Sequence, residues 1–171
     1  LSRFFLQLVA IATVLIAGGQ FALAQATSDI PLVIRNNGTG VNAGQDTLRF
    51  GVNPAGTNGK DAALGEIEQP PAPPSAVFDI RWINVGTSNN FGEGVKKNYR
   101  ASTSPTQRDT FRIKFQAGTG GFPVNVSWPN LTSYFGTAEL RYFDNNLGAN
   151  VSVNMNSVTS ASITDDQVTT L

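Results

Sequence analysis

The sequence predicts an all-β protein: an antiparallel β-sandwich, immunoglobulin-like or jelly-roll-like, with about eight strands behind an N-terminal apolar signal helix. Apolar and polar residues alternate in several short runs, which is the period of a strand with one buried face. Clusters of Gly, Asn and Pro separate these runs and are typical of turns. After residue 26, no stretch sustains the 3.6-residue period of an amphipathic helix.

The first 26 residues are predicted to be a secretory signal peptide that precedes the fold. Arg3 supplies a positive start, residues 4–17 are apolar, and the small residues that follow favour cleavage after Ala24 or Ala26. The apolar run is shorter than the roughly 20 residues of a membrane-spanning helix. We therefore expect export through the inner membrane, a secreted or cell-surface location, and membrane contact only before cleavage. The alternative is a retained, pilin-like helix in a filament subunit.

Residues 27–171 are expected to form a single β-sandwich domain. The expected strands are residues 31–36, 46–52, 77–85, 108–116, 123–128, 138–143, 150–155 and 160–164. The fourth run alternates most clearly, whereas the first and last are the weakest. Trp82 and Trp128 lie in apolar rows and are expected in the core, and Lys96 and Lys97 are expected in a solvated loop.

The end of the sequence predicts an incomplete sheet. Val168–Leu171 resembles a strand that begins or stops abruptly. We expect a protein truncated at this point, with one sheet edge left without its partner.

A long irregular segment joins the second and third expected strands. Its second part, Gln69–Pro74, reads Gln-Pro-Pro-Ala-Pro-Pro, and each proline removes a main-chain donor and favours extended geometry. We expect this proline strap to cross the surface. The polar residues before it form a loop of a length that is usually functional or disordered, so the loop is the expected place for any ligand.

Calcium is the one metal that this loop could attract, since Asp61, Glu66 and Asn58 offer oxygen ligands. The spacing of an EF-hand is absent: with Gly59 at the invariant glycine, Gly65 stands where the last carboxylate is needed. The alternative is that the two carboxylates cap turns or pair with Arg49 or Arg81. No other cofactor is predicted.

Composition argues against several functions. The chain has no cysteine and no histidine, which excludes disulfides and Ser-His-Asp or Cys-His catalysis. Its formal net charge of zero offers no basic surface for nucleic acid. We expect no enzyme, although a carboxylate pair for glycoside hydrolysis stays an open alternative among the 12 acidic residues.

An aromatic pair is the predicted ligand surface for a glycan. Tyr134 and Phe135 lie in the turn-like stretch Thr-Ser-Tyr-Phe-Gly-Thr, and aromatic rings suit the apolar faces of sugars. The expected partners are therefore a glycan or other surface proteins.

The order of several motifs resembles a recurring module of large secreted bacterial proteins that commonly end in a type IX secretion sorting domain. The similarity covers about Ile30 to Leu171 and rests on a strand ending in Phe-Gly, a Gly/Asp/Glu loop, the proline strap, Phe-Asp-Ile-Arg-Trp, a Ser-Trp strand and an Asn-Met strand. The resemblance implies a non-catalytic extracellular or cell-surface β-sandwich module that acts in interaction or as a structural spacer. A carbohydrate- or calcium-binding module is the alternative, and the resemblance supplies no catalytic residues.

Overall fold

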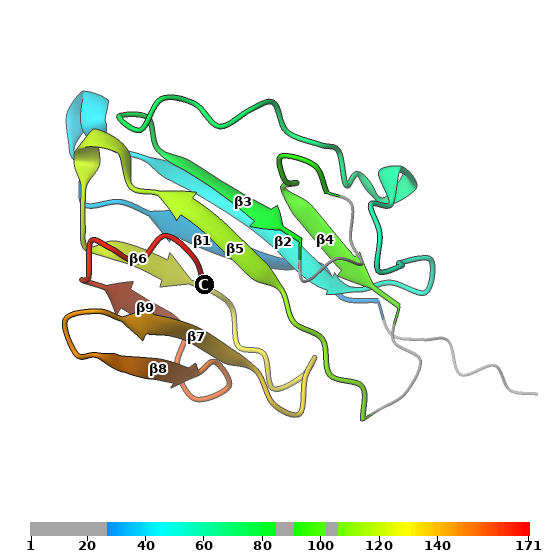
Figure 1. The fold of residues 1–171 in the computed structure, drawn as a ribbon. Helices are drawn as coiled ribbons and strands as arrows, with labels where there is room; N and C mark the ends of the chain where they lie inside the picture. Colours follow the sequence, from blue (N-terminus) through cyan, green and yellow to red (C-terminus); the bar gives the residue numbers. More distant parts are fainter. Residues whose placement is uncertain (1–26, 85–90, 102–105) are drawn as a thin grey trace, which may run out of the picture.

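The computed structural model describes residues 27–84, 91–101 and 106–171 and shows an all-β protein (Figure 1). Its strands are β1 (Ile30–Arg35), β2 (Gln45–Val52), β3 (Asp79–Ile83), β4 (Lys97–Arg100), β5 (Arg112–Gln116), β6 (Val124–Ser127), β7 (Glu139–Asp144), β8 (Ala149–Asn154) and β9 (Ser160–Ile163). Three single 3-10 turns, η1 (Gly40–Asn42), η2 (Ala62–Leu64) and η3 (Gly118–Gly120), lie between them. The predicted leader, residues 1–26, lies outside the described residues. None of the helices in the described part is long and apolar enough to cross a bilayer.

The largest sheet has five strands in the order β4-β2-β1-β6-β9. β1 lies at its centre because Ile30, Leu32 and Ile34 are all buried on one face. It pairs antiparallel with β2 and with β6, so that Ile34 stands opposite Val126. The run that alternated least clearly in the sequence is therefore the central strand.

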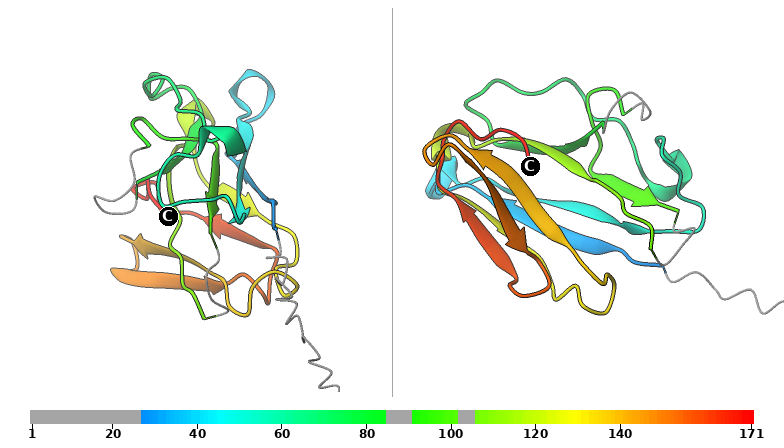
Figure 2. Two further views of the ribbon diagram at one scale, coloured as in Figure 1. Left: turned by 90° about the vertical axis from the view of Figure 1, so that its right-hand side faces the viewer. Right: turned by 60° about the horizontal axis from the view of Figure 1, so that its bottom comes forward.

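A second sheet, β3 paired antiparallel with β5, lies over β1 and β2 (Figures 1 and 2). Its inward side chains include Ile80 and Trp82, and the ring of Trp82 meets that of Phe50 from β2 at a centroid distance of 5.7 Å. Trp82 and Trp128 are only 2% and 5% exposed, which confirms the prediction that both belong to the core. Burial of such large rings supplies much of the hydrophobic stabilisation.

β4 differs from the prediction in two ways. Lys97 begins a strand instead of lying in a solvated loop, and β4 runs parallel to β2, so the sheet is not wholly antiparallel. The three residues that follow Lys97 are polar and all buried, and this hides the alternation that marks a strand. The chain passes between the sheets here, because Val95 bridges to Trp82 of β3 while Lys97 pairs with Arg49 of β2.

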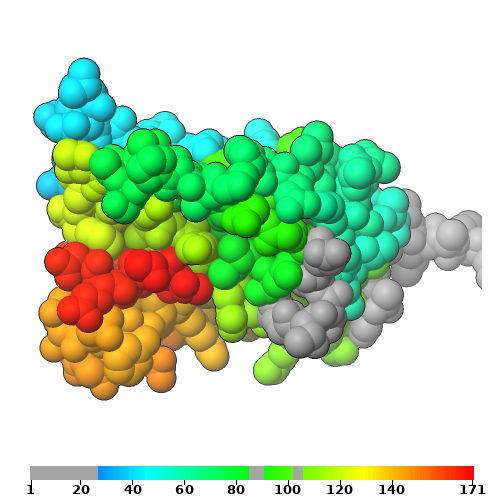
Figure 3. Space-filling model, turned by 45° about the horizontal axis from the view of Figure 1, so that its top comes forward, coloured from blue at the N-terminus to red at the C-terminus, as the bar shows by residue number. Residues whose placement is uncertain are grey.

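The proline strap, Gln69–Pro74, crosses the outside of the second sheet, as predicted (Figure 3). Two side chains of that sheet hold it by its carbonyl groups. Arg81 Nη1 donates to Pro70 O at 2.9 Å, and Gln116 Nε2 donates to Pro74 O at 3.1 Å. Prolines lack a main-chain donor, so their carbonyls are the groups through which the strap can be bound.

The C-terminal segment Val168–Leu171, predicted to be a strand that begins or stops abruptly, pairs with β5. Leu171 and Ile113 exchange two main-chain hydrogen bonds, of 3.0 and 2.9 Å. Phe115 N–H donates to Thr169 O at 3.0 Å. The segment therefore covers the edge of β5 that faces away from β3.

The third sheet is the hairpin of β7 and β8, joined by the turn at residues 145–148. Leu140 is buried in the core. At the open end of the hairpin, Trp128 donates Nε1–H to Met155 O at 3.0 Å and to Val158 O at 2.8 Å. At the turn between β7 and β8, buried Asp165 accepts a hydrogen bond from the main-chain N–H of Asn145 at 2.6 Å. Both ends of the hairpin are thus tied to the rest of the molecule.

Candidate functional site

The polar loop before the proline strap, residues 53–68, packs against the outer end of β4. Asp61 organises its first half, because its carboxylate accepts the N–H of Thr57 at 2.6 Å and lies 2.9 Å from Thr57 Oγ1. The same hydroxyl oxygen accepts Gly59 N–H at 2.9 Å. The side chain of Asp61 therefore closes a turn, as one reading of the sequence predicted.

Glu66 joins this loop to the sheet. Its side chain is 0% exposed, and its two oxygens accept Asp61 N–H at 2.8 Å and Tyr99 N–H at 2.5 Å. Tyr99 lies in β4, the edge strand, so the carboxylate takes the place of a neighbouring strand there. Burial raises the pKa of Glu66, and the two main-chain hydrogen bonds oppose the rise.

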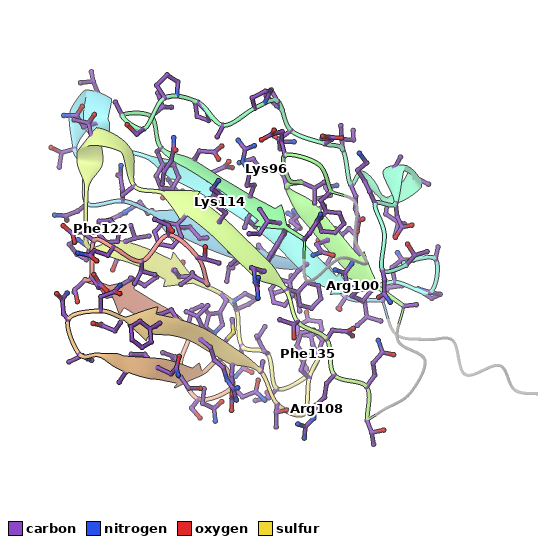
Figure 4. All side chains as sticks on the ribbon, in the orientation of Figure 1. Lys96, Arg100, Arg108, Lys114, Phe122 and Phe135 are labelled. Atoms are coloured by element: carbon purple, nitrogen blue, oxygen red, sulfur yellow. The ribbon has the colours of Figure 1, made fainter. Side chains whose placement is uncertain are left out.

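Arg100 lies at the end of β4 and is 3% exposed (labelled in Figure 4). Its guanidinium lies over the rings of Phe91 and Phe111, at 5.6 and 5.5 Å from their centroids, and Nη1 donates to Thr57 O at 3.2 Å. Burial lowers the pKa of Arg100 below its ordinary value, while the nearby charge of Glu66 opposes this fall. A cation between two rings in a dry site is a stabilising arrangement.

The side chains of Arg100 and Asn98 carry three unpaired polar atoms among the described residues. Arg100 Nη2 and both amide atoms of Asn98 are buried, with no hydrogen-bond partner among the described residues. Unpaired buried groups of this kind cost stability. They give the inner face of β4 a polar character.

A shallow cavity of about 290 Å³ opens on the other side of β4. Its lining residues are Thr27, Ser28, Asp29, Asn53, Leu64 and Tyr99. Asp29 and Tyr99 are already partnered in it: Tyr99 OH donates to Asp29 Oδ1 at 2.8 Å, and Arg49 Nη1 donates to Asp29 Oδ2 at 2.7 Å. Burial and this hydrogen bond raise the pKa of Tyr99, so the phenol stays protonated.

Two of the three proposed calcium ligands already accept hydrogen bonds, and the calcium site stays a prediction. Both oxygens of Asp61 accept from Thr57 within the loop, those of Glu66 accept from Asp61 and from Tyr99 of β4, and Asn58 is exposed. In the described ranges, no three acidic side chains come together in a way that could hold a metal. Of the alternative reading, the turn is seen but the pairing with arginines is not, because Arg49 pairs with Asp29 and Arg81 pairs with Asp79.

The predicted aromatic pair is divided between surface and core. Tyr134 is 51% exposed, but Phe135 packs on the core, stacked on Phe50 at a centroid distance of 6.1 Å (Figure 4). Tyr134 alone is therefore free to meet a ligand, and a glycan-binding role for the pair stays a prediction.

Sequence reasoning found the loop but missed its partners on β4 and the buried Arg81. Arg81 is 3% exposed and donates Nε–H to Asp79 Oδ2 at 2.7 Å as well as Nη1–H to Pro70 and Glu93 carbonyls. Its position opposite the apolar row of its strand indicated solvent, but the proline strap and the segment at Glu93–Gly94 cover it.

Comparison with known proteins adds no relative: no family model, no curated protein and no solved structure matches this chain significantly.

Proposed function

We propose that the chain is a secreted, non-catalytic β-sandwich module of the immunoglobulin-like or jelly-roll-like kind, which acts in interaction or as a spacer in a larger surface protein. The five-stranded sheet would be one layer, and β3 and β5, extended by Val168–Leu171, would be the other. Rings from both layers pack together at Phe50, Trp82 and Phe111, which supports a shared core between them.

The observation that carries this proposal is that the buried charged side chains bind main-chain atoms of loops and turns. Glu66, Arg81 and Asp165 are 0%, 3% and 0% exposed, and each is hydrogen-bonded to main-chain atoms of a loop or turn. Catalytic side chains usually lie in a cleft, have a perturbed pKa, and keep a donor or acceptor atom free to bind substrate. These groups instead hold irregular segments against the sheets, which is what a binding or spacing module requires.

Two measurements test the proposal. Protein exported by its native host should begin at Gln25 or Thr27, and an intact Leu1 on exported protein would refute secretion by a cleaved leader. The full chain should turn over no member of a panel of glycosides, esters and peptides. Turnover that the Glu66→Gln variant abolishes would refute the non-catalytic assignment.

A carbohydrate-binding module is the second candidate, and the cavity beside Tyr99 favours it. The amide of Asn53 lines it together with the ring of Tyr99, and sugar sites commonly combine such groups. A bound glycan would raise the melting temperature of the full chain by linkage, and an Asn53→Ala variant would lose that rise. Unchanged melting across a glycan panel and a calcium titration would remove both ligand hypotheses.

A further inference from the structure

Among the described residues, β8 pairs only with β7, and this pairing determines which main-chain groups of β8 point to its other edge. Met155 N–H donates to Ala138 O at 2.9 Å, and the register pairs Leu140 with Val153. Main-chain groups alternate in direction along an antiparallel strand, so Val151 and Val153 face β7. Those of Asn150, Ser152 and Asn154 face outward.

These outward residues are exposed, and Figure 1 shows β8 at the lower border of the molecule. The edge also lacks the protection found on the other sheets. Glu66 covers the edge of β4, and the edge strand β9 spans only Ser160–Ile163. β8 is longer, Ala149–Asn154, and contains no charge and no proline, which are the residues that normally block pairing between molecules.

The sequence of β8 shows what could pair with this edge. Residues 150–154 read Asn-Val-Ser-Val-Asn, which is the same in both directions. We propose that β8 pairs antiparallel with β8 of a second copy of this chain, about a two-fold axis at Ser152. Ser152 then faces Ser152 of the second copy, and Asn150 faces Asn154 of the second copy. Every outward residue meets an outward residue, so the register agrees with the phase that β7 imposes.

The main-chain bonds of this pairing follow from the same phase. The two Ser152 residues exchange two hydrogen bonds. The carbonyl of Asn154 already accepts Ser157 N–H at 3.1 Å and Val158 N–H at 3.3 Å. It is therefore the N–H of Asn154 that pairs, with the carbonyl of Asn150, once in each direction.

Exposed apolar side chains lie at both ends of the hairpin, where this axis brings them together. Leu147 in the turn before β8 is 70% exposed, and Val158 in the turn after it is 45% exposed. In the two-fold register, Leu147 stands opposite Ser157 of the second copy, next to its Val158. Contact between them would remove apolar surface from water at each end of the paired strands.

The interface is small, because it consists of two strands and their turns, and small interfaces are weak. Several copies held on one surface would pair more strongly through their high local concentration. The pairing names one partner for the interaction module proposed above but rests on β8 alone. A failure of self-association would leave the non-catalytic assignment untouched.

Cross-linking tests the axis directly, since the chain has no cysteine. In a hydrogen-bonded antiparallel pair the opposed Cα atoms are about 5.5 Å apart, which a disulfide can span. The Ser152→Cys variant of the full chain should therefore form a disulfide-linked dimer under mild oxidation. Asn150→Cys is the matched control, because its two copies would lie about 13 Å apart along the strands. Equal yields of dimer from the two variants would overturn the proposal.

A charge exchange at the same position provides an independent test. Ser152→Lys and Ser152→Glu place like charges opposite each other, so sedimentation of either variant alone should show less self-association than the unmodified chain. An equal mixture should associate again through Lys–Glu pairs. Circular dichroism should show that both variants are folded, since Ser152 is exposed. The proposal is wrong if the unmodified chain stays monomeric up to millimolar concentration, or if the mixture associates no more than its components.

Discussion

Replacement of Glu66 by glutamine tests the account of the polar loop most directly. Both oxygens of Glu66 accept main-chain N–H groups, at 2.8 and 2.5 Å. Glutamine keeps the shape but turns one acceptor into a donor, so one N–H group, of Asp61 or Tyr99, would face another donor. Loss of a hydrogen bond to a charged group costs about 1.5–3 kcal/mol. The neutral amide also avoids the desolvation that raises the pKa of Glu66, so we expect a net loss of about 2 kcal/mol.

The assay is unfolding in urea, followed by the fluorescence of Trp82 and Trp128, which are both buried. Glu68→Gln is the control, since it makes the same chemical change two residues away. Glu68 is exposed and pairs with Lys60 at 2.7 Å, and surface pairs contribute little. The reasoning is refuted if the two variants unfold at the same urea concentration.

The unmodified chain and the Glu66→Gln variant should also differ in how their stability depends on pH. Because burial raises the pKa of Glu66 in the folded state, the folded chain binds more protons than the unfolded chain above the ordinary value of 4.5. Stability contributed by this group therefore falls as the pH rises from 4.5 to the folded pKa, and stays constant above it. The Glu66→Gln variant should lack this fall, so the stability advantage of the unmodified chain over the variant should narrow as the pH rises across that window.

Three further changes test other contacts. Arg81→Met keeps the apolar stem but leaves Asp79 without its ion pair and the proline strap without one of its donors; we expect a loss of about 3 kcal/mol in urea unfolding and faster proteolysis within the strap. Trp128→Phe removes the donor to two main-chain carbonyls, which should cost about 1–2 kcal/mol by the same assay. Burial tends to raise the pKa of Asp29, but hydrogen bonds from Tyr99 and Arg49 outweigh it and lower the pKa. Its contribution is present above the ordinary value of 3.8 and is lost as the pH falls through the folded pKa, so thermal unfolding of Asp29→Asn should show a smaller loss of stability in acid.

The strands that could be predicted are those with one wet face and one dry face. β5 is the clearest case, since Ile113 and Phe115 are buried between exposed Arg112 and Lys114. β1 gave a weak signal because Val33, on its outer face, is also apolar. β4 gave none, because burial of its polar side chains depends on a loop and rings far away in the chain.

The candidate site could be predicted only in part, for a similar reason. The turn that Asp61 closes is local, since Thr57 lies only four positions before it, so the sequence could predict that Asp61 caps a turn. The contact of Glu66 with Tyr99 joins residues 33 positions apart. No spacing rule covers such a pair until the path of the chain between the two sheets is known, and that path runs through a strand that sequence patterns did not show.

The central place of β1 has a consequence for how the protein is made. One neighbour, β2, follows it closely, but the other, β6, brings Val126 to Ile34 from far along the chain. Until the ribosome has passed that point, the emerging chain presents an apolar strand with one unpaired side, which is the state that aggregates and that chaperones recognise. Fragments that stop before β6 should therefore be insoluble, and attempts to divide the protein into smaller folding units between residues 30 and 127 should fail.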